Sequence, residues 1–207
     1  MPEVRCAPRG PELTGHGARV SQGVRECDQF RALLLLLLVL LTGCTGVPQG
    51  VEPVKGVDFS RYLGTWYEIV RLDHGFERGL THVTATYSER KDGGIDVINR
   101  GFDSDSDSWR QAEGKAYFVE EPTVGHLKVS FFGPFYGSYV IAELDKAEYS
   151  YALVTGPNRD YLWILARTPA LSEAVLERLV ATAEHLGFAT DQLIFVDQSS
   201  PVGALEL

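Results

Sequence analysis

The chain has 207 residues, of which 44% are hydrophobic, 11% aromatic and 23% charged, and its formal net charge is −9. This composition is typical of a globular protein with one or two domains, and it excludes a disordered or collagen-like chain. Five of the 19 basic residues but only four of the 28 acidic residues precede Ala32, so the rest of the chain is strongly acidic and is not expected to bind nucleic acid.

A run of ten apolar residues, nearly all leucine, occupies positions 32–41. A membrane-spanning helix needs roughly 20 such residues, whereas this shorter run, preceded by Arg25 and Arg31, is typical of a secretory signal. The run ends in Leu-Thr-Gly before Cys44, which resembles the bacterial lipobox. The resemblance implies cleavage after residue 43 and diacylation of Cys44, and several acyl chains make a firm anchor. An ordinary signal peptide beside a chance cysteine is the alternative.

The amino-terminal segments are therefore predicted to be a targeting signal followed by a tether. Residues 1–43 are the predicted signal peptide, although the true start could lie downstream of Met1, and residues 44–57, rich in glycine and proline, are a predicted flexible tether. Thr45, rather than aspartate, follows Cys44. That choice resembles lipoproteins sent to the outer membrane, and it implies a lipid-anchored protein whose body lies in the periplasm. No cysteine follows Cys44, so the body has no disulfide.

From Gly64 onward, short alternating stretches of Val, Ile, Tyr, Phe and Thr are separated by turn residues. This pattern predicts eight antiparallel strands, at about 65–72, 81–90, 95–102, 109–119, 126–132, 138–145, 149–155 and 160–167. A row of strands has two open edges unless the first and last strands pair, and eight closed strands leave room for one small ligand. The predicted fold is an all-β, eight-stranded antiparallel up-and-down barrel in a single domain at 58–198.

The spacing of apolar residues changes after the last of these strands. Thr168-Pro169 interrupts the pattern, Ser172 can cap a helix, and Gly187 can end it. Apolar residues at 176, 179, 180, 183 and 186 then share one helical face, which we expect to pack against the outside of the barrel. Residues 193–196 are predicted to form a final short strand, and 199–207 a tail.

Several stretches resemble the lipocalin family. Gly64 and Trp66 form its G-x-W motif, and Arg167 supplies the arginine that the family packs on that tryptophan. The middle family motif, T-D-Y, survives only as Asp145 within Leu-Asp-Lys. Longer stretches at 65–69, 83–87, 113–116, 128–137 and 156–165 are similar to the bacterial branch of the family that is related to apolipoprotein D. The resemblance implies an outer-membrane lipoprotein that binds fatty acids or lysophospholipids and serves membrane maintenance.

Strand alternation predicts which side chains line the barrel. If Trp66 points inward, Glu68 and Val70 follow it on the inner face. The same argument on the other strands yields the candidate ligand-binding set, which is Glu68, Ala85, Tyr87, Asn99, Ala116, Phe118, Leu127, Val129, Phe131, Tyr139, Tyr161 and Trp163. Its small and polar members favour a pocket over a filled core, which remains the alternative. No basic residue falls clearly on the inner face, so the contact for a ligand head group is not placed.

The loop at 131–137 carries four aromatic residues and lies at the predicted open mouth, with the loops at 73–80 and 156–160. These aromatic rings could dip into lipid, gate the mouth or form a homodimer contact.

Signals for metals and catalysis are weak. Asp103, Asp105 and Asp107 alternate like the start of a calcium loop, but Ser108 and Gly114 stand where that loop needs glycine and glutamate. The histidines have no metal-ligand spacing, and no G-x-S-x-G motif is found. We therefore predict a binding protein without cofactor or metal. The alternatives are a lipid-modifying enzyme that uses Glu68 or Tyr161, and a docking lipoprotein with a filled barrel.

Overall fold

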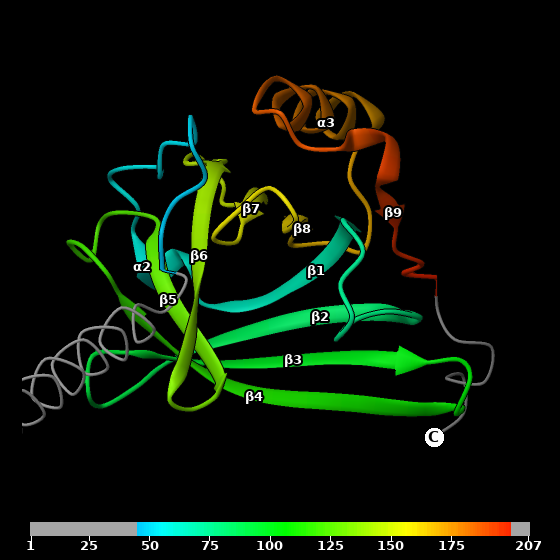
Figure 1. Cartoon of the computed structure of the whole chain (residues 1–207), viewed down its shortest axis with the longest axis horizontal. Coiled ribbons are helices and arrows are strands. Elements are labelled where there is room, and N and C mark those ends of the chain that lie inside the picture. Colours follow the sequence, from blue (N-terminus) through cyan, green and yellow to red (C-terminus); the bar gives the residue numbers. More distant parts are fainter. Residues whose placement is uncertain (1–44, 200–207) are drawn as a thin grey trace, which may run out of the picture. The chain divides into compact units, whose positions relative to one another are not determined.

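The computed structural model describes residues 45–199, and eight of their strands close into an antiparallel barrel (Figure 1). The strands are β1 (Gly64–Arg71), β2 (Leu80–Glu89), β3 (Ile95–Asp103), β4 (Ser108–Phe118), β5 (His126–Phe132), β6 (Phe135–Leu144), β7 (Tyr151–Thr155) and β8 (Leu162–Ala166). Each strand pairs with the next in the chain, and β1 pairs with both β2 and β8. This closure confirms the predicted fold and leaves no free edge within the ring.

The largest difference in strand bounds is at β6, which begins at Phe135 rather than at 138 because Phe132 and Phe135 pair across a two-residue turn. One α-helix was not predicted: α2 (Phe59–Tyr62) is too short to show a helical period. It begins where the Asp58 carboxylate accepts a hydrogen bond from the Ser60 amide at 3.0 Å. The helix lies at the end of the barrel where β1 begins, which we call the closed end.

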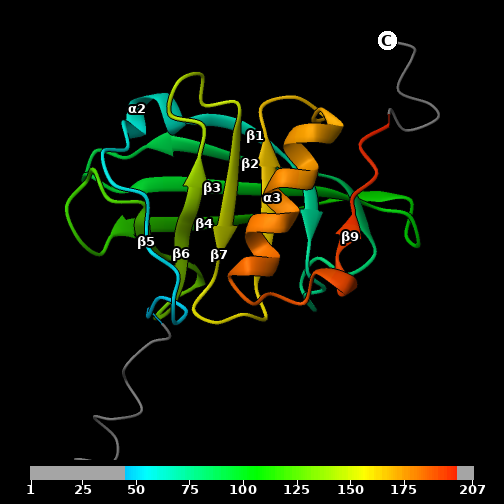
Figure 2. The same ribbon diagram turned by 90° about the horizontal axis from the view of Figure 1, so that it is seen from above.

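The predicted carboxyl-terminal helix is α3 (Glu173–His185), and it lies across the outer faces of β7 and β8 (Figure 2). Its residues Leu179 and Ala183 are fully buried in a hydrophobic cluster outside the barrel. A 3₁₀ helix (Thr190–Gln192) then leads to β9 (Ile194–Phe195), which adds to the edge of β1. A second hydrophobic cluster fills part of the barrel interior, so the wall between the clusters is apolar on both faces.

A β-bulge in β1 overturns the prediction that Val70 faces the interior. The pairing of β1 with β8 shifts register between Glu68 and Val70, and the extra residue reverses the alternation beyond that point. Val70 consequently packs in the outer cluster beneath α3. Arg71, expected outside, is 2% exposed and hydrogen-bonded to the inward-facing Glu68.

The segment that was predicted to be a flexible tether is instead packed on the barrel in its described part. Val51 and Val57 are buried, the Val54 amide donates to the Ile141 carbonyl at 2.9 Å, and the Gly125 amide donates to the Val54 carbonyl at 2.8 Å. Valines recur through this segment, and they bury against β6 despite the glycines and prolines around them.

The predicted signal peptide at 1–43, Cys44 and nearly all of the predicted tail at 199–207 lie outside the described residues. Within 45–199, no helix has the length and hydropathy that crossing a bilayer requires.

Candidate functional site

The barrel encloses a cavity of about 700 Å³. Its lining includes Phe76 and Pro157 from loops, and Phe132 from the last position of β5. All three lie at the end where β1 finishes, which we call the open end. A volume of this size lies within the range of roughly 300–1,000 Å³ that is typical of small-molecule sites.

Eleven of the twelve predicted binding residues line this cavity, and they come from β1, β2, β3, β4, β5, β6, the β7–β8 loop and β8. They are Glu68, Ala85, Tyr87, Asn99, Ala116, Leu127, Val129, Phe131, Tyr139, Tyr161 and Trp163. Phe118 is not among the lining residues, because its ring packs edge-on against Phe59 of α2, with centroids 4.8 Å apart. The prediction failed at the strand end, where the interior is filled by the helix below it.

The closed end is sealed by Trp66, whose side chain is fully buried. Its indole Nε1 donates to the Tyr62 carbonyl at 2.8 Å, and the Arg167 guanidinium lies 4.0 Å above its ring. That guanidinium also donates to the carbonyls of Arg61 and Thr65, at 2.6 and 3.0 Å. The arginine thus combines a cation–π contact with hydrogen bonds that close the backbone.

Gly64 and Asp145 complete this closed end. Gly64 has φ +93°, a conformation that favours glycine, and a Cβ there would lie 3.4 Å from an Arg167 nitrogen. The Asp145 carboxylate accepts hydrogen bonds from the Ser150 hydroxyl at 2.5 Å and the Ala147 amide at 3.1 Å, and these bonds lower its pKa. The degraded motif therefore still holds the β6–β7 turn through its one remaining residue.

Three tyrosine hydroxyls meet at the bottom of the cavity. The Tyr139 hydroxyl lies 2.7 Å from that of Tyr62 and 2.9 Å from that of Tyr87. Burial raises the pKa of all three, so each stays protonated at neutral pH. Each hydroxyl has a partner, so this end presents a polar floor that needs no ligand to satisfy it.

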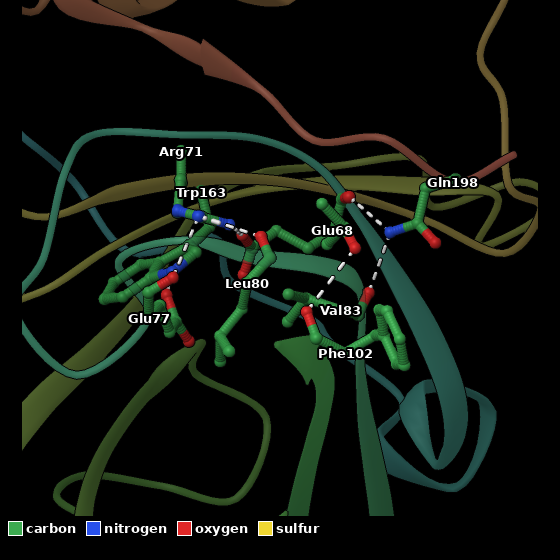
Figure 3. Close-up of polar contacts among 9 residues, drawn as sticks. Glu68, Arg71, Glu77, Leu80, Val83, Phe102, Trp163 and Gln198 are labelled. Carbon is green, nitrogen blue, oxygen red and sulfur yellow. Dashed lines mark hydrogen bonds and ion pairs between the residues drawn. The ribbon is translucent and has the colours of Figure 1, made fainter. Parts of the chain in front are cut away.

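A buried charge cluster stands on the β1 side of the cavity (Figure 3). Arg71 donates from Nη1 to the Glu68 carboxylate at 2.7 Å, and from Nη2 to the Glu77 and Leu80 carbonyls at 2.9 and 3.1 Å. The Trp163 indole donates to the Glu77 carboxylate at 3.0 Å. The Arg71 guanidinium therefore pairs with the carboxyl group of Glu68, while the carboxyl group of Glu77 is held by the Trp163 indole.

The charge balance of this cluster favours a protonated carboxyl. Burial, and then repulsion from Glu77, raise the pKa of Glu68 to about 8 against the opposing pull of Arg71. Burial also raises the pKa of Glu77. Glu68, which lines the cavity, consequently keeps its proton to a higher pH than a carboxyl group in water does.

His74 extends the cluster toward the open end. Its ring stacks on Tyr161 and Phe76, with centroids 5.1 and 5.3 Å apart, and burial lowers its pKa to about 4. The neutral ring belongs to an aromatic wall rather than to a metal site. No group of three His, Cys, Asp or Glu side chains among residues 45–199 is placed to hold a metal ion.

Sequence reasoning missed Arg71, Glu77, His74 and Tyr62 as parts of this interior. Arg71 enters through the bulge, Glu77 and His74 come from the β1–β2 loop, and Tyr62 comes from the short helix. None of these positions has a periodic pattern that could have marked it as inward. Asn99 was predicted, and its Oδ1 is buried on the wall without a hydrogen-bond partner among the described residues, so it is available to a ligand.

Comparisons with known proteins agree with this architecture. The family model described as "Lipocalin-like domain" matches residues 57–198. The "Outer membrane lipoprotein Blc" of Vibrio cholerae is 55% identical over 170 residues, which are 82% of this chain and 99% of the relative. Apolipoprotein D of Bos taurus is 30% identical over 185 residues, with coverage of 80% and 95%. The structure of insecticyanin from the tobacco hornworm matches 75% of this chain and 88% of its own, with a TM-score of 0.60 and 21% identity, and it shows the fold alone.

Proposed function

The chain belongs to the lipocalin family, and from this premise we propose that it is a lipid-anchored outer-membrane protein that binds a small hydrophobic or amphiphilic ligand inside its barrel. The observation that carries the proposal is the cavity of about 700 Å³, which is open at one end and lined chiefly by apolar side chains. Sequestering an alkyl chain there contributes about 0.8 kcal/mol for each buried methylene.

We propose fatty acids or lysophospholipids as the ligand class. The alkyl tail fits the wall formed by Val97, Leu127 and Val129, which ends at the tyrosine floor. The head group would lie toward the open end, near Glu68 and Glu77. Arg71 is already engaged by the Glu68 carboxyl group and two backbone carbonyls, so the cluster suits a neutral or zwitterionic head group better than a free carboxylate.

We propose that the anchor is a diacylglyceryl group on Cys44. The lipobox-like residues 41–44 and the lipoprotein relatives support this assignment, and so does the location that their printed name gives. Thr45, as the residue after the acylated cysteine, favours the outer membrane, with the barrel on its periplasmic side.

The two alternative functions fit the interior less well. A docking lipoprotein with a filled barrel is at odds with the cavity. For an enzyme, Glu68 is the best-placed candidate, but it is ion-paired with Arg71, and its neighbours supply no nucleophile. The relatives reported above are likewise a lipoprotein and an apolipoprotein rather than enzymes. Binding without chemistry is the function that this geometry supports best.

The test is whether ligand uptake depends on the free volume of the cavity. We expect the acylated protein, extracted in nanodiscs, to carry lipid that native mass spectrometry identifies, and to bind a fluorescent lysophospholipid saturably. Ala116→Trp fills the space beside Val129 and should reduce binding at least tenfold, because Ala116 lines the cavity.

Lys115→Trp is the matched control, because it adds the same ring to the adjacent exposed position on the outer face of β4. Equal binding by both variants, or no saturable binding by the parent protein, would contradict the proposal. A catalytic role would instead show itself as turnover of the lysophospholipid.

A further inference from the structure

We propose that the outer wall of the barrel holds a second binding site, which takes a phosphate group in a hollow of about 280 Å³. The donors of this site are the Arg100 guanidinium and the hydroxyl groups of Tyr67 and Thr84. Trp109 and Pro169 form apolar walls beside them. The hollow is separate from the cavity inside the barrel, so the inference goes beyond the proposed function.

The hollow exists because β1 and β2 stop pairing at this level. Their pairing ends at Tyr67 and Thr84, and the register of β2 with β3 shifts just before Thr84. The segment after β9 covers the resulting gap from outside, where the Gln198 amide donates to the carbonyls of Glu68 and Val83 at 2.8 and 2.9 Å (Figure 3). Gln198 lines the outer hollow, whereas Glu68 and Val83 line the inner cavity. The two spaces therefore lie on opposite sides of the same wall.

The three proposed donors occupy neighbouring positions in a row across three strands. Tyr67 of β1 pairs with Thr84 of β2, and Thr84 pairs with Arg100 of β3. Directly paired residues on one face of an antiparallel sheet have their Cβ atoms about 4.5–5.5 Å apart. The row thus presents two hydroxyl groups and a guanidinium to one hollow, and the oxygens of a phosphate group are strong acceptors for such donors.

Arg100 is the one arginine among residues 45–199 that has neither an ion pair nor a hydrogen bond there. Every other arginine in that range donates to a carboxylate or a backbone carbonyl. The exposed guanidinium of Arg100 lies 4.1 Å from the centroid of the Trp109 ring. Stacking uses the face of a guanidinium and leaves the N–H donors on its edge free. The hydroxyl groups of Tyr67 and Thr84 likewise have no hydrogen bond within residues 45–199.

Acidic side chains on the neighbouring segments are engaged elsewhere. Gln111, the partner of Arg100 on β4, donates to the Glu113 carboxylate at 3.1 Å. The Asp197 carboxylate accepts hydrogen bonds from the amide and the hydroxyl of Ser199, at 2.8 and 2.6 Å. The described chain therefore leaves the positive charge of Arg100 without a partner, and this local charge favours an anion although the body of the protein is acidic.

The walls of the hollow favour a phosphate that is attached to an apolar group. Trp109 is 44% exposed, and the His82 ring meets it edge-on, with centroids 6.3 Å apart. The exposed Pro169 lines the same hollow. Apolar atoms next to the phosphate would leave water against these rings, whereas a bare phosphate would use the polar donors alone.

The experiment is a fluorine NMR titration of the full acylated protein in dodecyl maltoside, a detergent without phosphate. The chain has three tryptophans, and 5-fluorotryptophan labels all of them, with Trp66 and Trp163 as interior references. The probes are inorganic phosphate and the short-chain lipid dihexanoylphosphatidic acid. We expect each probe to shift the resonance of Trp109 saturably. Tighter binding of the lipid would support a lipid head group as the ligand, and equal affinities would support free phosphate.

Variants test the donors one at a time. Arg100→Gln should weaken both probes at least tenfold, and Tyr67→Phe, which keeps the ring, should weaken them severalfold. Lys115→Gln is the matched control, because it removes the same charge from an exposed position on the outer face of β4. Its affinity should stay within twofold of the parent. Equal losses in Arg100→Gln and Lys115→Gln would mean that net charge alone attracts the probes, and this result would overturn the site.

The remaining outcomes separate this site from the inner cavity and from the end of the chain. Ala116→Trp, which fills the cavity, should leave the titration of Trp109 within twofold, and a loss there would overturn the outer site whether or not the cavity binds lipid. Residues 200–207 lie outside the described residues and include Glu206. If that carboxylate already held Arg100, Glu206→Gln would tighten phosphate binding at least tenfold, which would overturn the proposal of an external ligand. The absence of a saturable shift with both probes would also overturn it.

Discussion

The two ends of the barrel are built in opposite ways. At the closed end, Trp66 is fully buried, Arg167 covers its ring, and the tyrosine hydroxyls are hydrogen-bonded to one another. Toward the open end, the carboxyl groups of Glu68 and Glu77 are buried with Arg71 as the partner of Glu68, and Phe132 is exposed to solvent. The polar groups of the closed end are hydrogen-bonded within the protein. The open end has exposed apolar rings that are available to a ligand or a partner.

This contrast separates stability from function along the barrel axis. Groups that are fully partnered stabilise the fold and are costly to remove. Buried carboxyl groups and exposed apolar rings lower stability, and they are typical of sites that meet a ligand or a surface. Substitutions at the two ends should therefore change the free energy of unfolding by different amounts and in opposite directions.

The largest effect is expected for Trp66→Ala. The substitution leaves a cavity at the closed end and removes the surface on which Arg167 stacks, so we expect a loss of about 3–5 kcal/mol in the free energy of unfolding. Trp109, 44% exposed beside the open end, is the matched position, and Trp109→Ala should cost about 1 kcal/mol. Chemical denaturation measures the free energy of unfolding of both variants. Similar losses would mean that the two ends do not differ in their contribution to stability.

The next effect is expected for Tyr139→Phe. Its hydroxyl is the shared partner of Tyr62 and Tyr87, so its removal leaves two buried groups without that hydrogen bond and should cost about 1–3 kcal/mol. Tyr161→Phe is the control, because the hydroxyl of Tyr161 has no hydrogen bond within residues 45–199 and its ring only stacks. An equal loss in both variants would mean that the hydroxyl network does not stabilise the closed end.

A smaller effect, of opposite sign, is expected for Glu68→Gln at alkaline pH. The folded protein raises the pKa of Glu68 from 4.5 to about 8, so it binds this proton more tightly than the unfolded chain does. The stability contribution of Glu68 is present in full below pH 4.5 and declines as the pH rises to about 8. Its removal should therefore make the variant gain on the parent by up to about 2 kcal/mol between pH 6.5 and 8.

The pH interval is chosen because another buried group titrates below it. Burial lowers the pKa of His74 from 6.5 to about 4, which makes stability rise with pH between those values and opposes the effect of Glu68. Glu89→Gln, at an exposed position of β2, is the control. A difference between variant and parent that stays constant from pH 6.5 to 8 would mean that Glu68 is already ionised.

The sequence predicted the closed end better than the open end, for a physical reason. Alternation with period two marks strands and their inner faces, so the barrel and most of its lining could be predicted from it. The contact of Trp66 with Arg167 was predicted from the resemblance to the lipocalin family. These features depend on regular backbone. Asp145 likewise keeps its turn, although the motif around it is degraded.

The three loops of the open end were predicted, but the charged groups near it could not be, because irregular backbone positions them. A single bulge turns Val70 to the outer face of the barrel and Arg71 to the inner face. No residue type in β1 marks the position of that extra residue. Glu77 reaches the interior from a loop, where periodicity carries no information. The glycines and prolines of the segment at 45–57 indicate a spacer, whereas its valines pack it against β6.

The smallest effect on stability is expected where the largest apolar rings are exposed. Phe132→Ser combined with Phe135→Ser should change the free energy of unfolding by no more than about 0.5 kcal/mol for each substitution, because neither ring is packed in the fold. Differential scanning calorimetry on protein in detergent, away from a bilayer, measures this directly. A loss above about 2 kcal/mol would mean that the rings fold back on the hairpin and help to hold it. In that case the open end would be stabilised by its own side chains, as the closed end is.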